Sequence, residues 1–312
     1  MTKEKSHNSC LICNSNDIEI LGEYRNIHPD FDSLKRAHCK SCDMIFANPM
    51  PSTEKMESFN STYFKSAHGG LSESKESLAF FRAIGKIRGN YLEGFLKKKG
   101  IDATSILEIG PGHGFFAENW ILKNPGISYQ GLESDRSCHS TLLKIGVDVL
   151  NPMSDMPLTD VVVISHVLEH VTDPIDFLTR VTKGLRPGGA LFIEVPCKDC
   201  EHKPLDEPHL LFFDKYSMNL LLEKVGFFDV KLSYHGRQIK ELKNETFFSK
   251  KWRSLRSRLI NMGIIAPFSF NKKKMEFIEN SLERAAVAPY KAHLDSEQPS
   301  WWLRAVALKN NL

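Results

Sequence analysis

Residues 107–114 constrain the fold most, because a carboxylate at the end of an apolar run is followed there by three alternate glycines. The apolar run 105–109 predicts a buried strand and residues 115–122 predict a helix, so the glycines form the bend between them. A bare backbone lets a ligand approach closely, and the amide end of the helix faces the bend. Glu133 ends a second predicted strand, where a doubly wound sheet places an acid against ribose hydroxyls. This arrangement predicts a nucleotide cradle; the alternative is an ordinary strand-to-helix turn.

The spacing of the glycines limits which nucleotide the cradle accepts. A dinucleotide fingerprint reads G-x-G-x-x-G and brings the helix dipole to a pyrophosphate, whereas this chain has the tighter order Gly110-x-Gly112-x-Gly114. Glu108, two residues before the first glycine, would repel a pyrophosphate but suits an amine.

With these residues, and with the blocks at 160–174 and 185–190, the sequence resembles the class I S-adenosylmethionine-dependent methyltransferases. The blocks stand in the order typical of that family. The resemblance implies an α/β fold with a doubly wound Rossmann-like sheet, the glycines under the methionine part of the cofactor, and the acid at 133 on its ribose. Asp155 and Met156 would flank the adenine, although an aspartate between two prolines is also a common turn former. The cofactor-binding residues predicted in this way are Glu108, Gly110, Gly112, Gly114, Glu133, Asp155, Met156, Ser165 and His166.

Composition adds limits rather than a function. A chain of 312 residues with 41% hydrophobic content can bury a full core. A net charge of +3 does not favour nucleic acid as a partner. The first residues are polar and no apolar run approaches the roughly 20 residues that cross a bilayer, so we expect a cytoplasmic protein without a membrane partner.

Four of the seven cysteines form a metal-binding pattern. Cys10-x-x-Cys13 and Cys39-x-x-Cys42 offer two thiolate pairs, and cysteines of a cytoplasmic chain are expected to be reduced. Four thiolates leave no open position, so we predict a structural zinc ribbon; iron in the same cage stays open. Cys197 and Cys200, with His202 and His209 nearby, leave open a second metal site, whereas Cys138 is expected to be a small buried hydrophobe.

Residues 44–64 resemble the segment that follows the ribbon in a branch of methyltransferases acting on nucleotide-linked sugars and related small molecules. In that branch a tyrosine-containing arm closes over the cofactor, which makes Tyr63 a candidate pocket residue; the alternative is a core aromatic. We expect a ribbon lobe at 1–50, an arm and N-terminal helices at 51–100, the cofactor-binding core at 101–235, an insertion at 236–300 and the final strand at 301–312.

The predicted insertion carries 13 Lys or Arg against 7 Asp or Glu. Helical spacing predicts one helix at 248–262 and a second at 275–288. The basic residues form either a solvated face on two packed helices or a lid that captures an anionic substrate such as the diphosphate of a sugar nucleotide. Residues 301–308 are expected to form the antiparallel strand that completes the sheet.

Methyl transfer from a sulfonium needs alignment, exclusion of water and, for many acceptors, removal of a proton. His209 is the leading candidate base because relatives carry a histidine at this place, with Glu207 to orient it and Tyr63 to share the role. A histidine that only orients a loop is the alternative. His170 is expected to cap a helix or to pack.

The sequence therefore predicts methyl transfer to a small molecule, such as a sugar nucleotide, a glycan precursor or a secondary metabolite. The sugar C-methyltransferases of that branch carry a further C-terminal domain without a counterpart here, so oxygen is expected as the acceptor atom at least as much as carbon. Two other functions stay open, namely an RNA methyltransferase that grips phosphates and a cofactor-binding module without activity. The acceptor and the oligomeric state do not follow from the sequence.

Overall fold

The structure is a computed structural model that describes residues 4–23, 31, 34–63, 74–151, 156–202, 208–265 and 275–310. Its centre is a mixed sheet with the strand order β11-β10-β12-β8-β7-β4-β5-β6. Neighbouring strands from β8 to β6 run parallel, so their carboxyl ends share one edge of the sheet. These strands are β4 (Ser105–Ile109), β5 (Ser128–Leu132), β6 (Asp148–Val149), β7 (Thr159–Ser165) and β8 (Leu185–Pro196).

The last long strand lies inside the sheet. β12 (Ser300–Lys309) pairs antiparallel with β8 on one side and with β10 (Phe227–Gln238) on the other. The short strand β11 (Asp295–Ser296) closes this edge beside β10. The predicted late antiparallel strand is thus confirmed, and the α/β doubly wound fold with it.

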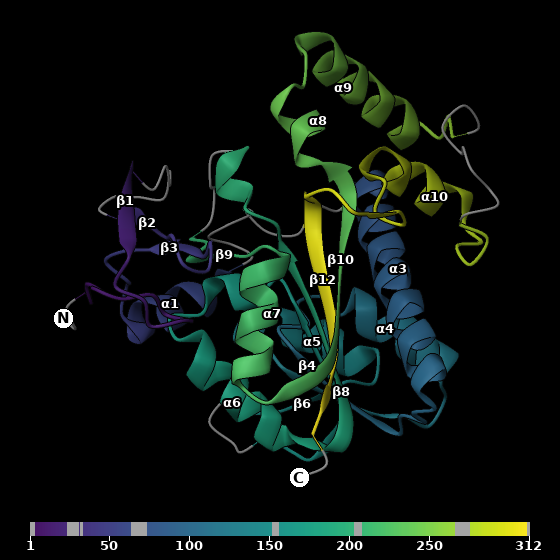
Figure 1. Cartoon of the computed structure of the whole chain (residues 1–312). Coiled ribbons are helices and arrows are strands. Elements are labelled where there is room, and N and C mark those ends of the chain that lie inside the picture. Colours follow the sequence, from purple (N-terminus) through teal and green to yellow (C-terminus); the bar gives the residue numbers. More distant parts are fainter. Residues whose placement is uncertain are drawn as a thin grey trace.

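Helices cover both faces of the sheet (Figure 1). Val161 and Val163 pack with α3, α4 and α5, whereas Val162 and Ile164 pack with α6 and α7. Because side chains alternate along a strand, a parallel strand that is covered on both faces has a continuous apolar run. The helices are α3 (Lys75–Lys99), α4 (Phe115–Lys123), α5 (His139–Lys144), α6 (Pro174–Gly184) and α7 (Lys215–Lys224).

Helix α3 lies close against α4 and thereby forms one side of the site. The side chain of Ser74 caps its start by accepting from the amide of Ser77, and Gly100 ends it in the left-handed conformation with φ of 67°. A Cβ on Gly85 would lie 2.5 Å from the carbonyl oxygen of Phe115. The bare backbone at Gly85 therefore allows α3 to approach the start of α4.

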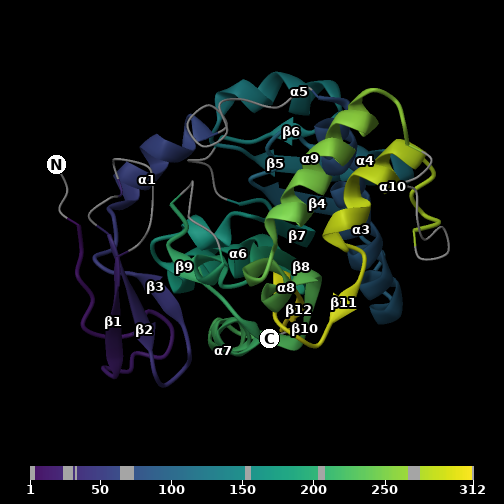
Figure 2. The ribbon, with the colours of Figure 1, turned by 90° about the horizontal axis from the view of Figure 1, so that it is seen from above.

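The N-terminal region shares a sheet with the core. β1 (Ile18–Glu23), β2 (Lys35–Cys39) and β3 (Ile45–Ala47) continue into β9 (Leu211–Phe212), which comes from the segment before α7. Helix α1 (Thr53–Asn60) follows β3. Figure 2 shows these strands at the end of the molecule opposite α10. One hydrophobic cluster joins Ile12 and Phe46 to Phe212 and Leu107, so the ribbon region and the core are packed as one unit.

The segment between β10 and β12 is helical. α8 (Ile239–Lys243) and α9 (Phe247–Asn261) project beyond the sheet in Figure 1, and α10 (Ser281–Val287) packs on α3. The second helix is shorter than predicted because the side chain of Asn280 accepts from the amides of residues 282 and 283 and so caps it. Among the residues that the structure describes, none of the helices combines the length and the apolar character that crossing a bilayer requires.

Several cations of this segment are engaged in ion pairs. Arg237 and Arg253 each contact Glu245, at 2.9 and 2.8 Å. Arg256 reaches Glu76 on α3 at 3.2 Å and is almost fully buried. These contacts hold α9 against α3 and against the segment that precedes it, as the interpretation of a packed basic face expects.

Candidate functional site

The bend after β4 has three left-handed glycines, with φ of 70°, 55° and 77° at Gly110, Gly112 and Gly114. The first and the third of them leave room for different side chains. A Cβ on Gly110 would lie 2.4 Å from Cγ2 of Val167, and one on Gly114 would lie 2.5 Å from Cδ1 of Ile145. Gly110 and Gly112 line a cavity at the carboxyl edge of the sheet, whereas Gly114 packs towards α5. The missing side chain of Gly114 therefore makes room for the α5 region, and its predicted contact with a ligand stays a prediction.

Two buried carboxylates stand at the ends of neighbouring strands. Glu133 follows β5 and accepts from the amides of Gly112 at 2.7 Å and Asp135 at 2.8 Å. Glu108 accepts from the hydroxyl of Tyr129 at 2.6 Å. Burial raises the pKa of Glu108 to about 7, although the hydrogen bond from Tyr129 lowers it. Gly110, Gly112 and both acids thus line one wall of the cavity.

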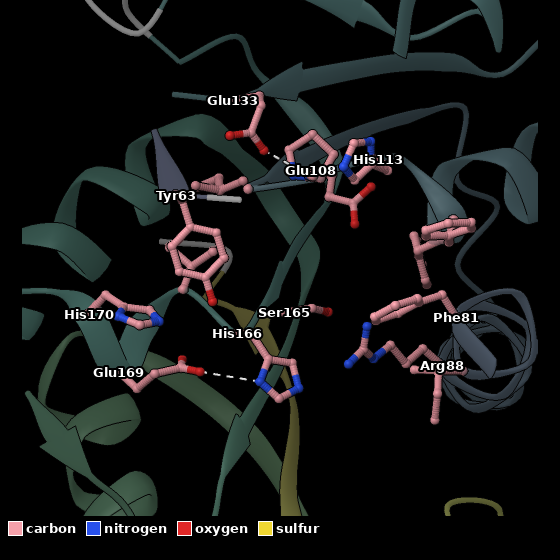
Figure 3. A pocket seen from close by; sticks show the side chains of 18 of the residues that line it. Tyr63, Phe81, Arg88, Glu108, His113, Glu133, Ser165, His166, Glu169 and His170 are labelled. Atoms are coloured by element: carbon pink, nitrogen blue, oxygen red, sulfur yellow. Dashed lines mark hydrogen bonds and ion pairs between the residues drawn. The ribbon is translucent and has the colours of Figure 1, made fainter. Parts of the chain in front are cut away.

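The cavity has a volume of about 580 Å³ and extends from this wall to a group of histidines (Figure 3). Phe81 and Arg88 line it from α3, and Tyr63 enters from the segment after α1. Eight of the predicted catalytic and cofactor-binding residues line it: Tyr63, Glu108, Gly110, Gly112, Glu133, Ser165, His166 and His209.

Tyr63, His170 and His209 form a contiguous group in the lining of the cavity. The ring centroids of Tyr63 and His170 are 5.7 Å apart, and those of His170 and His209 are 4.8 Å apart. Nδ1 of His209 lies 2.8 Å from the carboxylate of Asp199, and both residues are buried. Asp199, on the short helix η4 (Asp199–Glu201), therefore orients the predicted base, whereas Glu207 lies outside the described residues.

His166 connects the cavity to a buried charge network. It adopts a left-handed backbone with φ of 56°, and its ring lies 3.3 Å from Glu169 and 3.4 Å from Glu194. Glu194 in turn pairs with Arg88 and Arg304 at 2.5 Å each. Burial alone would raise the pKa of Glu194, but the two guanidinium groups hold it well below its usual range.

The sequence analysis did not single out Arg88, Glu194 or Asp199. One signal was present, because Glu194 interrupts the apolar strand 190–195. A carboxylate in the middle of a buried strand needs a cation partner. Its partners are 106 and 110 residues away in the sequence, so the pattern alone did not indicate them.

Replacing Glu194 by Gln is expected to destabilise the fold by about 3–5 kcal/mol, because it leaves the buried guanidinium group of Arg304 and the partly buried one of Arg88 without their anion. Chemical denaturation followed by circular dichroism measures the change. Glu93→Gln is the matched control, since its pair with Lys123 is exposed and is expected to contribute at most about 1 kcal/mol. Equal stabilities of both variants would contradict a stabilising role for the network.

Met156 is the remaining predicted cofactor-binding residue that the structure describes. Met156 packs against Gly184 beside the start of β7, which is the edge of the sheet opposite the cavity. Met156 is not among the residues that line the cavity, and its predicted place beside an adenine stays a prediction. Asp155 and Glu207 lie outside the described residues. In the described part of the chain, Cys197 and Cys200 belong to no cluster of potential metal ligands.

The four N-terminal cysteines converge. Their Sγ atoms lie within 4.8 Å of one another, with 3.4 Å between Cys10 and Cys42 and 3.5 Å between Cys13 and Cys39. A tetrahedral site with sulfur at about 2.3 Å from the metal separates the sulfurs by about 3.8 Å. The geometry fits a metal held by four thiolates.

Comparison with known proteins gives one family match. The model described as a methyltransferase domain matches residues 80–232. No curated protein matches the chain.

Similar solved structures share low sequence identity with the chain. The plantazolicin methyltransferase BamL, in complex with a triazolic desmethylPZN analog and SAH, is 15% identical, with 82% of this chain and 97% of that one covered and a TM-score of 0.49. A possible histamine N-methyltransferase from Thermotoga maritima is 16% identical, with coverages of 72% and 91% and a TM-score of 0.43. Phosphoethanolamine N-methyltransferase 2 of Haemonchus contortus is 17% identical, with coverages of 71% and 52% and a TM-score of 0.45.

Proposed function

Because the chain is a class I S-adenosylmethionine-dependent methyltransferase, with its methyltransferase domain at residues 80–232, we propose that it methylates a small molecule such as a sugar nucleotide, a glycan precursor or a secondary metabolite. The observation that carries this proposal is the continuous cavity, which joins the glycine bend to the polar group of Tyr63, His170 and His209. A cavity of about 580 Å³ lies in the range of small-molecule sites.

The residues at the bend fit S-adenosylmethionine. Glu133 would hold the ribose hydroxyls, and Gly110 with Gly112 would lie under the methionine part. The ammonium and sulfonium of the cofactor are cationic, and the buried Glu108 and Glu133 place acidic groups on the wall that would face them. When bound, the cofactor supplies an electrophilic methyl group for direct displacement.

The opposite end of the cavity would hold the acceptor. Asp199 fixes the ring of His209 by a buried contact at Nδ1, and the Tyr63 ring lies against His170. Aromatic side chains Phe81 and Phe115, stacked with 5.4 Å between their centroids, line the α3 side and limit the entry of water. We propose that His209 and Tyr63 prepare an acceptor atom for transfer, whether oxygen or carbon.

Incubation of a small-molecule extract with the protein and methyl-labelled S-adenosylmethionine tests the function. Mass spectrometry is expected to show one labelled product, whose mass identifies the acceptor. Label that enters the RNA fraction instead would favour an RNA methyltransferase, and the absence of any labelled product despite cofactor binding would favour a binding module.

We further propose that the four-cysteine cluster binds structural zinc. Cys39→Ser is expected to reduce the zinc content from about one ion per chain to none and to lower the melting temperature of the whole chain, because the ribbon shares a hydrophobic cluster with the core. Elemental analysis and thermal denaturation measure the two effects. Cys138→Ser, a buried cysteine outside the cluster, is the control and should keep its zinc. Iron in place of zinc would correct the identity of the metal.

A further inference from the structure

A second group of potential metal ligands lies inside the cavity. Glu169, His170 and His209 are all buried, and a ligand atom of each lies within 4.8 Å of the others. Glu169 and His170 belong to the short helix η3 (Leu168–His170), and Figure 3 shows them on one wall of the cavity. The amide of Leu210 donates to the carbonyl of Glu169 at 2.6 Å. This backbone contact holds His209 beside the other two residues.

Both imidazole rings are oriented in the same manner. Nδ1 of His209 contacts the carboxylate of Asp199 at 2.8 Å, and Nδ1 of His170 contacts the carbonyl oxygen of Pro208 at 3.1 Å. A carbonyl oxygen accepts only, so a proton on Nδ1 of His170 satisfies that contact, and the same tautomer suits the pair of His209 with Asp199. The lone pair of each ring is then on Nε2. Metal-binding histidines have this arrangement, in which the other ring nitrogen donates to a carboxylate or a carbonyl group.

Glu169 supplies an independent indication. Its side chain is 1% exposed, and within the described residues neither carboxylate oxygen has a hydrogen-bond partner. The ring of His166 lies 3.3 Å from one of its carboxylate oxygens. Burial of a carboxylate costs several kcal/mol unless hydrogen bonds or a cation compensate. A metal ion beside Glu169 would supply that compensation.

We propose that Glu169, His170 and His209 bind one divalent transition-metal cation through a carboxylate oxygen and two Nε2 atoms. Two imidazoles and one carboxylate suit Mn²⁺, Fe²⁺, Co²⁺, Ni²⁺ or Zn²⁺ better than the all-oxygen preference of Mg²⁺ and Ca²⁺. Three protein ligands leave coordination positions open towards the cavity, unlike the closed four-thiolate cluster.

The role of this cation rests on the proposed function. A hydroxyl oxygen of the acceptor takes an open position, and the positive charge helps its proton leave to water. The oxygen then bonds to the methyl carbon while the carbon–sulfur bond of the sulfonium breaks, which leaves a neutral thioether. In this arrangement His209 is a metal ligand and oxygen is the acceptor atom.

Electron paramagnetic resonance of added Mn²⁺ tests the site on the full chain with its own zinc in place. Mn²⁺ binds more weakly than Zn²⁺ to a given site and is not expected to displace it from four thiolates. The signal of free Mn²⁺ should fall until about one ion is bound per chain. Asp199→Asn should weaken this binding about 10- to 100-fold. The isosteric substitution Glu169→Gln and the truncation His209→Ala, which each remove a ligand atom, should weaken it further.

His113→Ala is the matched control, because His113 lines the same cavity on the side of the glycine bend. It should retain Mn²⁺ binding. Absence of binding at millimolar Mn²⁺, or equal binding by wild type and the variants of Glu169 and His209, would overturn the inference. Loss of Mn²⁺ binding in Cys13→Ser alone would also overturn the inference, because it would assign the ion to the cysteine cluster.

The failure of this inference and the failure of the proposed function give different results. Calorimetry of cofactor binding and transfer of the labelled methyl group are measured on the same preparation. Methyl transfer that persists without Mn²⁺ binding would leave the proposed function intact and remove the metal site. Mn²⁺ binding without methyl transfer to any acceptor would leave the metal site intact and remove the proposed function.

Discussion

A Gly112→Val variant is expected to bind S-adenosylmethionine at least about 100-fold more weakly than the wild type, a loss of about 3 kcal/mol. Gly112 has a positive φ of 55° and lines the cavity, and its amide donates to Glu133 at 2.7 Å. A β-branched residue is strained in this left-handed region. Its side chain would also occupy the bend, and a shifted amide would release Glu133. Isothermal titration calorimetry measures the affinity.

Strain alone must be separated from the loss of the cradle. Gly126→Val provides the matched control, because Gly126 also has a positive φ, 89°, with no atom within 4 Å of an added Cβ. It lies before β5 at the edge of the sheet opposite the cavity, so it should lower stability without changing cofactor affinity. Zinc content and circular dichroism confirm that both variants fold. Wild-type affinity in Gly112→Val would remove the assignment of the bend.

The second large effect is expected for His209→Ala, which should lower the rate of methyl transfer about 10²- to 10⁴-fold. Cofactor affinity should stay near that of the wild type, because His209 belongs neither to the glycine bend nor to the two acids beside it. Single-turnover transfer to the acceptor found by mass spectrometry measures the rate. The loss is expected whether His209 accepts a proton directly or binds a cation, since both prepare the acceptor.

His38→Ala is the control for removal of a histidine, because His38 lies on β2 and pairs with Asp43. Its rate should match that of the wild type. Equal losses of turnover and of cofactor affinity in His209→Ala would indicate a structural role instead. Addition of Mn²⁺ to the wild type then discriminates between the two modes of action, since only the cation-dependent one is stimulated.

The sheet and the glycine bend were predictable because their signals are local. The apolar run at 105–109, the glycines after it and the acid at 133 stand in short, ordered blocks. The antiparallel final strand was also predictable, since residues 301–308 are apolar except for Arg304 and follow the helical segment. The exact start of α10 was not predicted. The helical spacing of residues 275–280 indicated an earlier start, but the side chain of Asn280 caps the helix, which therefore begins at Ser281.

The side chains that surround His209 in the cavity were predicted only in part. His209 and Tyr63 were singled out by resemblance, but Glu169 and Asp199 were not. Glu169 has its backbone joined by a hydrogen bond to the amide of Leu210, 41 residues later, and no sequence period marks such a contact. The union of the ribbon with the core through β9 was equally invisible, because a strand of two residues, Leu211–Phe212, carries no pattern of its own.

The sequence by itself determined the strand run, the bend and the two thiolate pairs, because backbone conformation and ligand spacing depend on neighbours a few residues apart. Only the tertiary structure decided that Arg88 reaches Glu194 and that Glu169, His170 and His209 converge. Such pairs form when separate crossovers bring distant segments to one edge of the sheet. The physical reason is that burial selects partners by proximity in space, which the order of residues along the chain does not specify.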